Sequence, residues 1–147
     1  MATFSKFNAF VENLAEKVHN LGSDTLKIAL TNTAPTSADD TFSDISEIAG
    51  GSGYTAGGTA ATISSSAQTS GTYKLVLADV VFTASGGSIG PFRYAVLYND
   101  TPTSPADPVI GYWDYGSNVT LADGETFTVD FDASAGVMTL ALSLIHI

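Results

Sequence analysis

The fold is decided by the stretch LADGETFTVDFD, residues 121–132. Phe127, Val129 and Phe131 alternate there with polar residues, which is the pattern of a β-strand with one dry face and one wet face. Asp123-Gly124, just ahead of them, is a typical two-residue turn and predicts a β-hairpin. The chain around this stretch should therefore be built from antiparallel strands.

Strand-like sequence continues on both sides of this stretch. Leu26, Ile28 and Leu30 alternate with other residues and predict a half-buried strand. Further strands are expected over residues 60–66, 72–84, 91–99, 108–115, 117–121, 125–132 and 136–141. Short strands joined by glycine-rich turns predict a mainly β fold, an antiparallel, jelly-roll-like β-sandwich over residues 23–141.

An amphipathic helix is expected over residues 3–21, ending at Gly22. Its apolar side chains recur at spacings of three and four residues: Phe4, Phe7, Val11, Leu14, Val18 and Leu21. Two roles remain open for this N-terminal part, residues 1–22. The helix packs on the sandwich, which is the favoured interpretation because the pattern lasts less than three heptads, or it lies at a subunit interface.

Composition narrows the class of protein. The chain of 147 residues fits one domain, and its 15 acidic and 5 basic residues give a formal net charge of −10. Such a surface repels phosphate groups, so we expect no nucleic-acid partner and no membrane partner. The absence of cysteine excludes disulfides and thiolate chemistry. Charged residues interrupt the N-terminal apolar pattern, so no signal peptide is expected, and no segment is apolar enough to span a bilayer.

The last six residues, LSLIHI (142–147), match the in-frame translation of a transposon end used in preparing sequencing libraries. We expect them to be a sequencing-adapter translation from a metagenomic contig, not native sequence, and exclude them from functional argument. The alternative is a genuine final strand, because Leu142, Leu144 and Ile147 suit a strand.

Few residues suggest catalysis or metal binding. His19 is interpreted as a helix-terminal histidine whose protonated ring suits the helix dipole, and no nucleophile motif accompanies it. Asp130 and Asp132 begin a run that resembles a calcium loop, but Ala135 occupies the glycine position and no glutamate closes it. The glycine-rich stretch 50–59 precedes a predicted strand and lacks a lysine, so it does not fit a phosphate loop. We therefore expect no enzyme, no catalytic residue, no cofactor and no metal.

Aromatic residues concentrate on neighbouring predicted strands: Tyr94, Tyr98, Tyr112, Trp113 and Tyr115. Most should fill the core, because aromatics do so in two-sheet folds. The alternatives are a subunit interface or a sugar-stacking platform. The candidate interface residues are Phe4, Phe7, Val11, Leu14, Tyr112, Trp113 and Tyr115.

Several segments resemble a family of small, mostly uncharacterised structural proteins of tailed bacteriophages. They are HNLGSDTLKIALTNTAP (19–35), GYTAGGT (53–59), GGSIGPFRYAVLYND (86–100), WDYG (113–116) and LADGETFTVDFD (121–132). The resemblance covers nearly all of residues 1–141. It implies a virion-associated structural role and brings no catalytic motif with it.

The expected function is a non-enzymatic structural component of a tailed-phage virion, made in the host bacterial cytoplasm. The first hypothesis is a capsid decoration (cement) protein whose partner is the major capsid protein or a tail protein. A homo-oligomer, with a trimer as one form, is expected. The alternative is a tail- or fibre-associated module that binds a host-surface glycan, and a carboxylate-dependent hydrolase ranks third.

Overall fold

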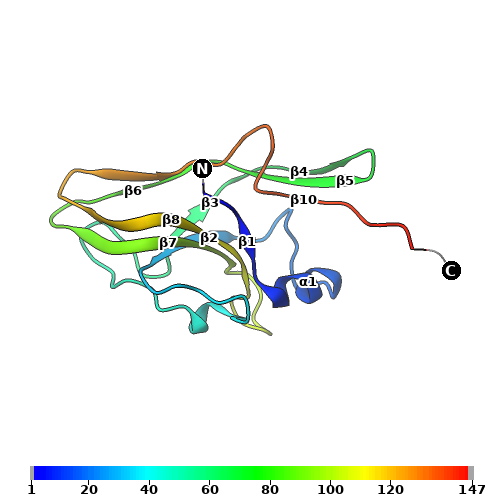
Figure 1. Ribbon diagram of the computed structural model, residues 1–147, viewed down its shortest axis with the longest axis horizontal. Helices are drawn as coiled ribbons and strands as arrows, with labels where there is room; N and C mark the ends of the chain where they lie inside the picture. The colour runs from blue at the N-terminus through cyan, green and yellow to red at the C-terminus, as the bar shows by residue number, and fades with distance from the viewer. Residues whose placement is uncertain (1, 146–147) are drawn as a thin grey trace.

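The computed structural model describes residues 2–145 and shows two packed layers of antiparallel strands with one short helix (Figure 1). The predicted mainly β sandwich is confirmed. Its elements are β1 (Ser5–Lys6), α1 (Asn8–Ala15), β2 (Leu26–Thr31), the 3-10 helix η1 (Phe42–Asp44), β3 (Thr59–Ala61), β4 (Ile63–Thr69), β5 (Thr72–Leu77), β6 (Val80–Thr83), β7 (Ile89–Asn99), β8 (Val109–Leu121), β9 (Thr126–Val129) and β10 (Met138–Leu140).

One layer is a five-stranded sheet in the order β1-β8-β7-β2-β3. The facing layer consists of a three-stranded sheet, β10-β5-β4, and a two-stranded ribbon, β6-β9. The main core lies between the layers and includes Leu30, Leu75, Phe92 and Leu97. A second core covers the other face of the five-stranded sheet, where Phe7, Ala29, Ile45, Val96, Tyr98 and Val109 pack together.

The second core corrects the prediction for β2. Leu26, Ile28 and Leu30 are buried as expected, but Ala29 and Thr31 on the other face are also completely buried. Alternation alone could not reveal this, because it depends on residues far away in the sequence that cover the outer face.

The predicted helix over residues 3–21 is wrong at both ends. Ser5 and Lys6 form a strand paired with Tyr112 and Gly111 of β8, so the helix begins only at Asn8. It ends at Ala15, because Lys17 adopts a left-handed conformation (φ 71°). The N–H of Val18 then donates to the carbonyl of Asn13, which satisfies one of the last helical carbonyls. Gly22 therefore has no part in ending the helix.

The predicted hairpin at Asp123-Gly124 is also wrong. The turn itself is tight, since the N–H of Glu125 donates to the carbonyl of Ala122 at 2.9 Å. However, β8 pairs with β7 while β9 pairs with β6, so the turn carries the chain from one layer to the other. The N–H of Gly124 donates to the carbonyl of Ala84, and the N–H of Ala84 donates to the carbonyl of Glu125, so the turn is joined to the end of β6. The chain that follows β6 also passes to the other layer there, on its way to β7.

Two predicted strand boundaries change for related reasons. The expected strand over residues 72–84 is divided into β5 and β6 at Ala78-Asp79, where the chain passes from the three-stranded sheet to the ribbon. The expected break at Gly116-Ser117 does not occur, because β8 continues through Gly116 (φ 101°) with a changed register against β7.

The residues that follow β10 extend away from the two layers (Figure 1). Leu142, Leu144 and Ile145 are 88%, 99% and 86% exposed, and residues 141–145 form no strand. The expectation of an adapter-derived segment also falls on His146 and Ile147, which lie outside the described residues.

Candidate functional site

The aromatic cluster on β8 divides between the two faces of its sheet. Tyr112 turns toward the second core and its ring lies 5.2 Å from that of Phe7. Trp113 turns toward the facing layer, with its ring 5.0 Å from Phe4 and 5.6 Å from Phe131. The alternation of a β-strand separates the two, because successive side chains point to opposite faces.

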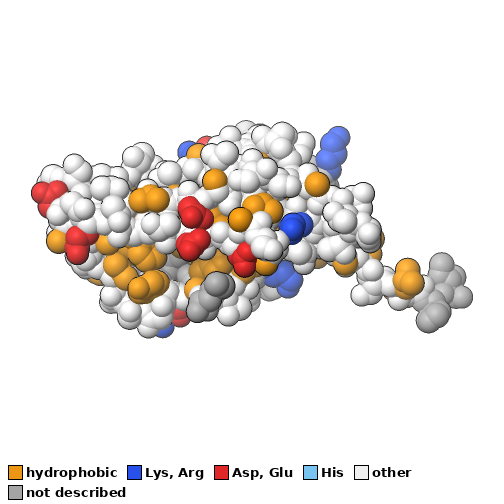
Figure 2. Space-filling view, turned by 90° about the horizontal axis from the view of Figure 1, so that it is seen from above, with side chains coloured by type: hydrophobic (Ala, Val, Ile, Leu, Met, Phe, Trp, Pro, Cys, Tyr) orange, Lys and Arg blue, Asp and Glu red, His pale blue; other side chains and the backbone are white. Residues whose placement is uncertain are grey.

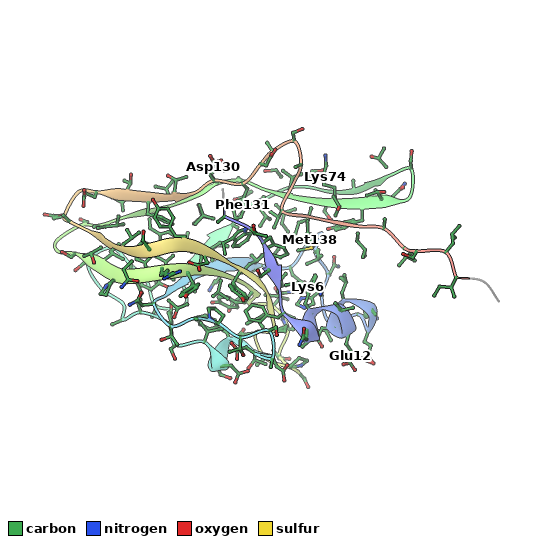
Figure 3. All side chains as sticks on the ribbon, viewed as in Figure 1. Lys6, Glu12, Lys74, Asp130, Phe131 and Met138 are labelled. Carbon is green, nitrogen blue, oxygen red and sulfur yellow. The ribbon has the colours of Figure 1, made fainter. Side chains whose placement is uncertain are left out.

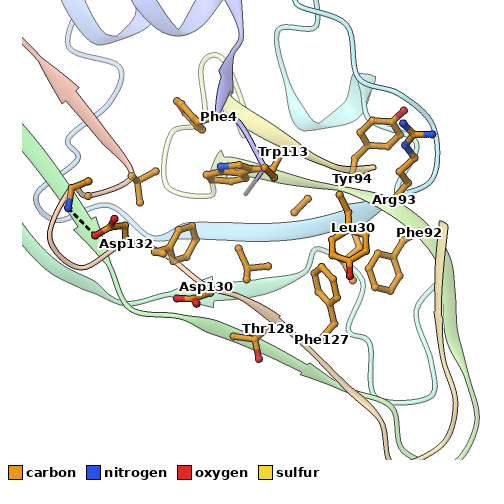
Figure 4. Close-up of a pocket in the computed structure, with 18 residues that line it drawn as sticks. Phe4, Leu30, Phe92, Arg93, Tyr94, Trp113, Phe127, Thr128, Asp130 and Asp132 are labelled. Atoms are coloured by element: carbon orange, nitrogen blue, oxygen red, sulfur yellow. Dashed lines mark hydrogen bonds between the residues drawn. The ribbon is translucent and has the colours of Figure 1, made fainter. Parts of the chain in front are cut away.

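Trp113 and Tyr115 line a cavity of about 300 Å³ between the layers (Figure 4). Phe92, Phe127 and Phe131 complete its apolar wall. Tyr115 is 57% exposed and stands edge-on to Phe127, with ring centroids 5.4 Å apart. The space-filling view shows hydrophobic side chains gathered beside acidic ones on this part of the molecule (Figure 2). The cavity therefore offers aromatic faces that are open to solvent on one side.

Charged and polar side chains lie around the cavity. Arg93 donates two hydrogen bonds to Asp114, at 2.7 and 3.0 Å, and its guanidinium lies 5.6 Å from the ring centre of Tyr94. Asp130 is exposed on the opposite wall and points outward, whereas Phe131 points between the layers (Figure 3). Such a site can stack the apolar face of a ligand and accept hydrogen bonds from its hydroxyl groups.

Hydrogen bonds favour the charged form of two carboxylates near this cavity, Asp114 and Asp132. The Arg93 guanidinium lowers the pKa of Asp114, and the N–H of Gly116 lowers it further. Hydrogen bonds from the N–H groups of Ala135 and Ser134 lower the pKa of Asp132. A lowered pKa suits an acceptor of hydrogen bonds and does not suit a general acid at neutral pH.

The seven candidate interface residues do not form one surface. Phe4, Trp113 and Tyr115 line the cavity. Phe7 is completely buried and Tyr112 packs against it, so Phe7 offers no surface to a partner. Leu14 is half-buried against the main core, while Val11 on α1 is 53% exposed.

His19 corrects another prediction, because it lies beyond the end of α1 and is only 6% exposed. Its Nδ1 lies 3.1 Å from the Asn99 side-chain nitrogen, which also donates to Asp24 at 2.7 Å. Since both amide hydrogens of Asn99 are then used, Nδ1 is the acceptor and the ring proton lies on Nε2. Nε2 is buried without a hydrogen-bond partner among the described residues. Burial lowers the pKa of His19 to about 4, against a smaller opposite effect of Asp24, so the ring is neutral near pH 7.

The two motifs that the sequence suggested for ions have structural uses. Asp132 closes the turn at residues 132–136 through its bonds to Ser134 and Ala135. In the glycine-rich loop, the Glu47 carboxylate accepts hydrogen bonds from the Tyr54 hydroxyl and the Gly57 N–H. Across residues 2–145, no group of three or more histidine or acidic side chains is placed to hold a metal ion.

Sequence reasoning did not find the partnership of Asn99 with His19 and Asp24, nor that of Phe127 with Tyr115. Asn99 is 80 residues from His19 and 75 from Asp24, Phe127 and Tyr115 lie on different strands, and neither group carries a shared motif. Among the described helices, none has the length and apolar character needed to cross a membrane. Comparisons with protein-family models, curated proteins and solved structures gave no match.

Proposed function

We propose that this chain is a non-enzymatic structural component of a tailed-phage virion, a capsid decoration protein that binds the outside of the shell. The resemblance of its sequence segments to structural proteins of tailed phages supports the proposal. Two of those segments, residues 86–100 and 113–116, lie on β7 and β8 at the centre of the five-stranded sheet. The resemblance to phage structural proteins therefore includes the central strands of the larger sheet.

The observation that carries the proposal is that many acidic side chains hold loops through hydrogen bonds. Carboxylates accept hydrogen bonds from main-chain N–H groups at loops throughout the fold: Asp24 from Asn20, Asp44 from Asp40 and Thr41, Asp79 from Phe131, Asp123 from Gly86, Glu125 from Ala122, and Asp132 from Ser134 and Ala135. These bonds hold loops in a defined shape. A protein that functions by shape fit to many copies of one partner needs this rigidity, because an ordered surface loses less entropy on binding.

The proposal is tested by measuring whether the chain binds to assembled capsid shells. Empty shells of a major capsid protein from the phage genome that encodes this chain are mixed with the purified chain and sedimented. We expect saturable co-sedimentation at a fixed ratio of chain to capsid protein, and cryo-electron microscopy should place the chain at one lattice position. A chain that remains in the supernatant at saturating concentration would contradict the proposal.

A second function, recognition of a host-surface glycan by a tail or fibre module, is favoured by the cavity alone. Trp113 and Tyr115 present aromatic faces there, and acidic side chains stand nearby as hydroxyl acceptors. Binding to a glycan array should then be lost in Tyr115→Ala and kept in Val11→Ala, since both residues are more than half exposed but Val11 lies on α1. An array without binding by the wild-type chain removes this alternative.

A further inference from the structure

One edge of the sandwich has unused main-chain hydrogen-bonding groups. β4 is the outer strand of the sheet β10-β5-β4, and the β4–β5 hairpin closes through the two-residue turn Ser70-Gly71. Alternate residues of an outer strand direct both main-chain groups away from the sheet. β4 therefore presents a template onto which another extended strand can be added.

The hydrogen-bond pattern identifies the residues that face outward. The carbonyl of Leu75 accepts from Val137, so the main chain of Leu75 is directed toward the β10 side. Ser66, the partner of Leu75 on β4, must then direct its N–H and carbonyl away from β5. The same alternation assigns the outward direction to Gln68, two residues further along.

Residues 66–69 of this edge carry none of the side chains that normally protect a free strand, and the register shift of the β4–β5 pair lies before them, between Ile63 and Ser65. Such edges usually carry lysine or proline, or are very short. β4 has seven residues, with the sequence ISSSAQT. The outer strands β1 and β10 are shorter: β1 has two residues, one of them Lys6, and β10 has three.

The distribution of charge favours β4 as the place where two copies of the chain meet. The chain has a net charge of −10, so two copies repel each other over most of their surfaces. Residues 48–73, which include all of β4, contain no charged side chain. Ser65, Ala67, Gln68 and Thr69 are exposed there, and their small or neutral side chains place no charge against an identical strand. Two copies can therefore approach most closely along this edge.

We propose that two copies of the chain pair antiparallel through β4, around a two-fold axis at Ala67. Ser66 of one copy then lies opposite Gln68 of the other, and each such pair exchanges two main-chain hydrogen bonds, giving four in all. The two three-stranded sheets become one continuous six-stranded sheet. This inference does not depend on the virion role, and it names a dimer where the sequence alone suggested a trimer.

The test measures the molar mass of the full-length chain by sedimentation velocity over a wide range of concentration. We expect the mass to rise from the monomer value of 15.2 kDa to twice that value. Gln68→Pro removes an outward main-chain N–H, together with the side-chain acceptor of the Gly71 N–H in the exposed turn, and should leave a monomer at every concentration. Thr139→Pro is the matched control on β10, because Thr139 pairs with Lys74, whose main chain faces β4, and its own N–H therefore also points outward. This variant should still dimerise.

A second variant covers the case in which Gln68→Pro fails to fold. Ala67→Glu places a carboxylate beside Lys74 within one copy, which the monomer tolerates, but sets two carboxylates face to face across the two-fold axis. It should remain folded by circular dichroism and lose the dimer.

Hydrogen exchange provides the direct readout. The amides of Ser66 and Gln68 should be protected in the wild-type chain at high concentration and unprotected in Ala67→Glu, while the amide of Thr139 exchanges quickly in both. A wild-type monomer at all concentrations, a trimer, or a dimer that persists in Ala67→Glu with unprotected Ser66 would overturn the proposal. The last result would place the contact between copies elsewhere, for example on the exposed residues after β10.

Discussion

Gly58 shows how one residue fixes the position of the glycine-rich loop. Its φ is +80°, and a Cβ atom added there would collide with the main chain of Ile28 and Ala29 on β2. Gly71 has almost the same φ, +83°, but an added Cβ meets nothing. Alanine substitutions at these two glycines therefore distinguish the cost of the left-handed conformation from the cost of a steric collision.

Gly58→Ala should destabilise the protein by about 3 kcal/mol or more, because a left-handed conformation and a steric collision both oppose the new methyl group. Gly71→Ala should cost only about 1 kcal/mol, from the conformation alone. Urea unfolding monitored by circular dichroism measures both. Equal losses in the two variants would show that space at Gly58 is not limiting.

His19 should give the protein a characteristic loss of stability in mild acid. Its pKa is about 4 in the folded chain and near 6.5 when unfolded, so the unfolded state binds the proton more readily. The stabilising contribution is complete above pH 6.5 and is lost as the pH falls toward 4, by about 3 kcal/mol at most. The difference in unfolding free energy between wild type and His19→Gln should change over this pH range. A constant difference would show that His19 titrates normally in the folded protein.

At the scale of elements, one hydroxyl group joins the glycine-rich loop to β2. The Tyr54 hydroxyl accepts a hydrogen bond from the buried N–H of Leu30 at 3.0 Å and donates one to Glu47 at 2.7 Å. Tyr54 also packs against Phe82 of β6, with ring centroids 5.8 Å apart. Loop, sheet and ribbon therefore meet at this side chain.

Tyr54→Phe should destabilise the protein by about 1–3 kcal/mol, because it leaves the Leu30 N–H buried without a partner. Tyr115→Phe is the control, since Tyr115 is more than half exposed, and should change stability by less than about 0.5 kcal/mol. Thermal unfolding compares the two. Similar small effects in both variants would mean that Leu30 finds another acceptor.

For the whole molecule, charge should oppose association between copies. Added salt screens repulsion between two chains that each have a charge of −10, and the screening length falls from about 30 Å at 0.01 M to about 8 Å at 0.15 M. The β4-paired dimer should therefore become several-fold tighter as sodium chloride increases, measured by sedimentation velocity. Weaker association in salt would indicate attraction between opposite charges at the interface.

The residues after β10 should contribute little to the stability of the whole. Because Leu142, Leu144 and Ile145 are almost fully exposed, removal of residues 142–147 should change the unfolding free energy by less than about 0.5 kcal/mol. Removal of residues 138–147 is the comparison, since it also deletes β10 and its pairing with β5. A large loss on the shorter deletion would show that this segment packs on the protein.

The sequence by itself determined the class of fold. The alternation of Phe127, Val129 and Phe131 predicted a strand, and glycine-rich breaks separated short strands correctly over most of the chain, because these signals depend on near neighbours. It also placed Trp113 and Tyr115 among the candidate residues, since large aromatic side chains with a polar group suit an interface or a sugar-binding surface.

The tertiary structure alone decided which strands pair and which faces are covered. Asp123-Gly124 makes the predicted turn, yet β9 leaves β8 for β6, because main-chain hydrogen bonds to Ala84 hold the crossing between layers. Likewise, Ser5 and Lys6 pair with β8 and so form a strand instead of the start of the helix. His19 is buried in contact with Asn99, which lies 80 residues away in the sequence. Local sequence sets the conformation of a segment, whereas pairing and burial depend on residues that only folding brings together.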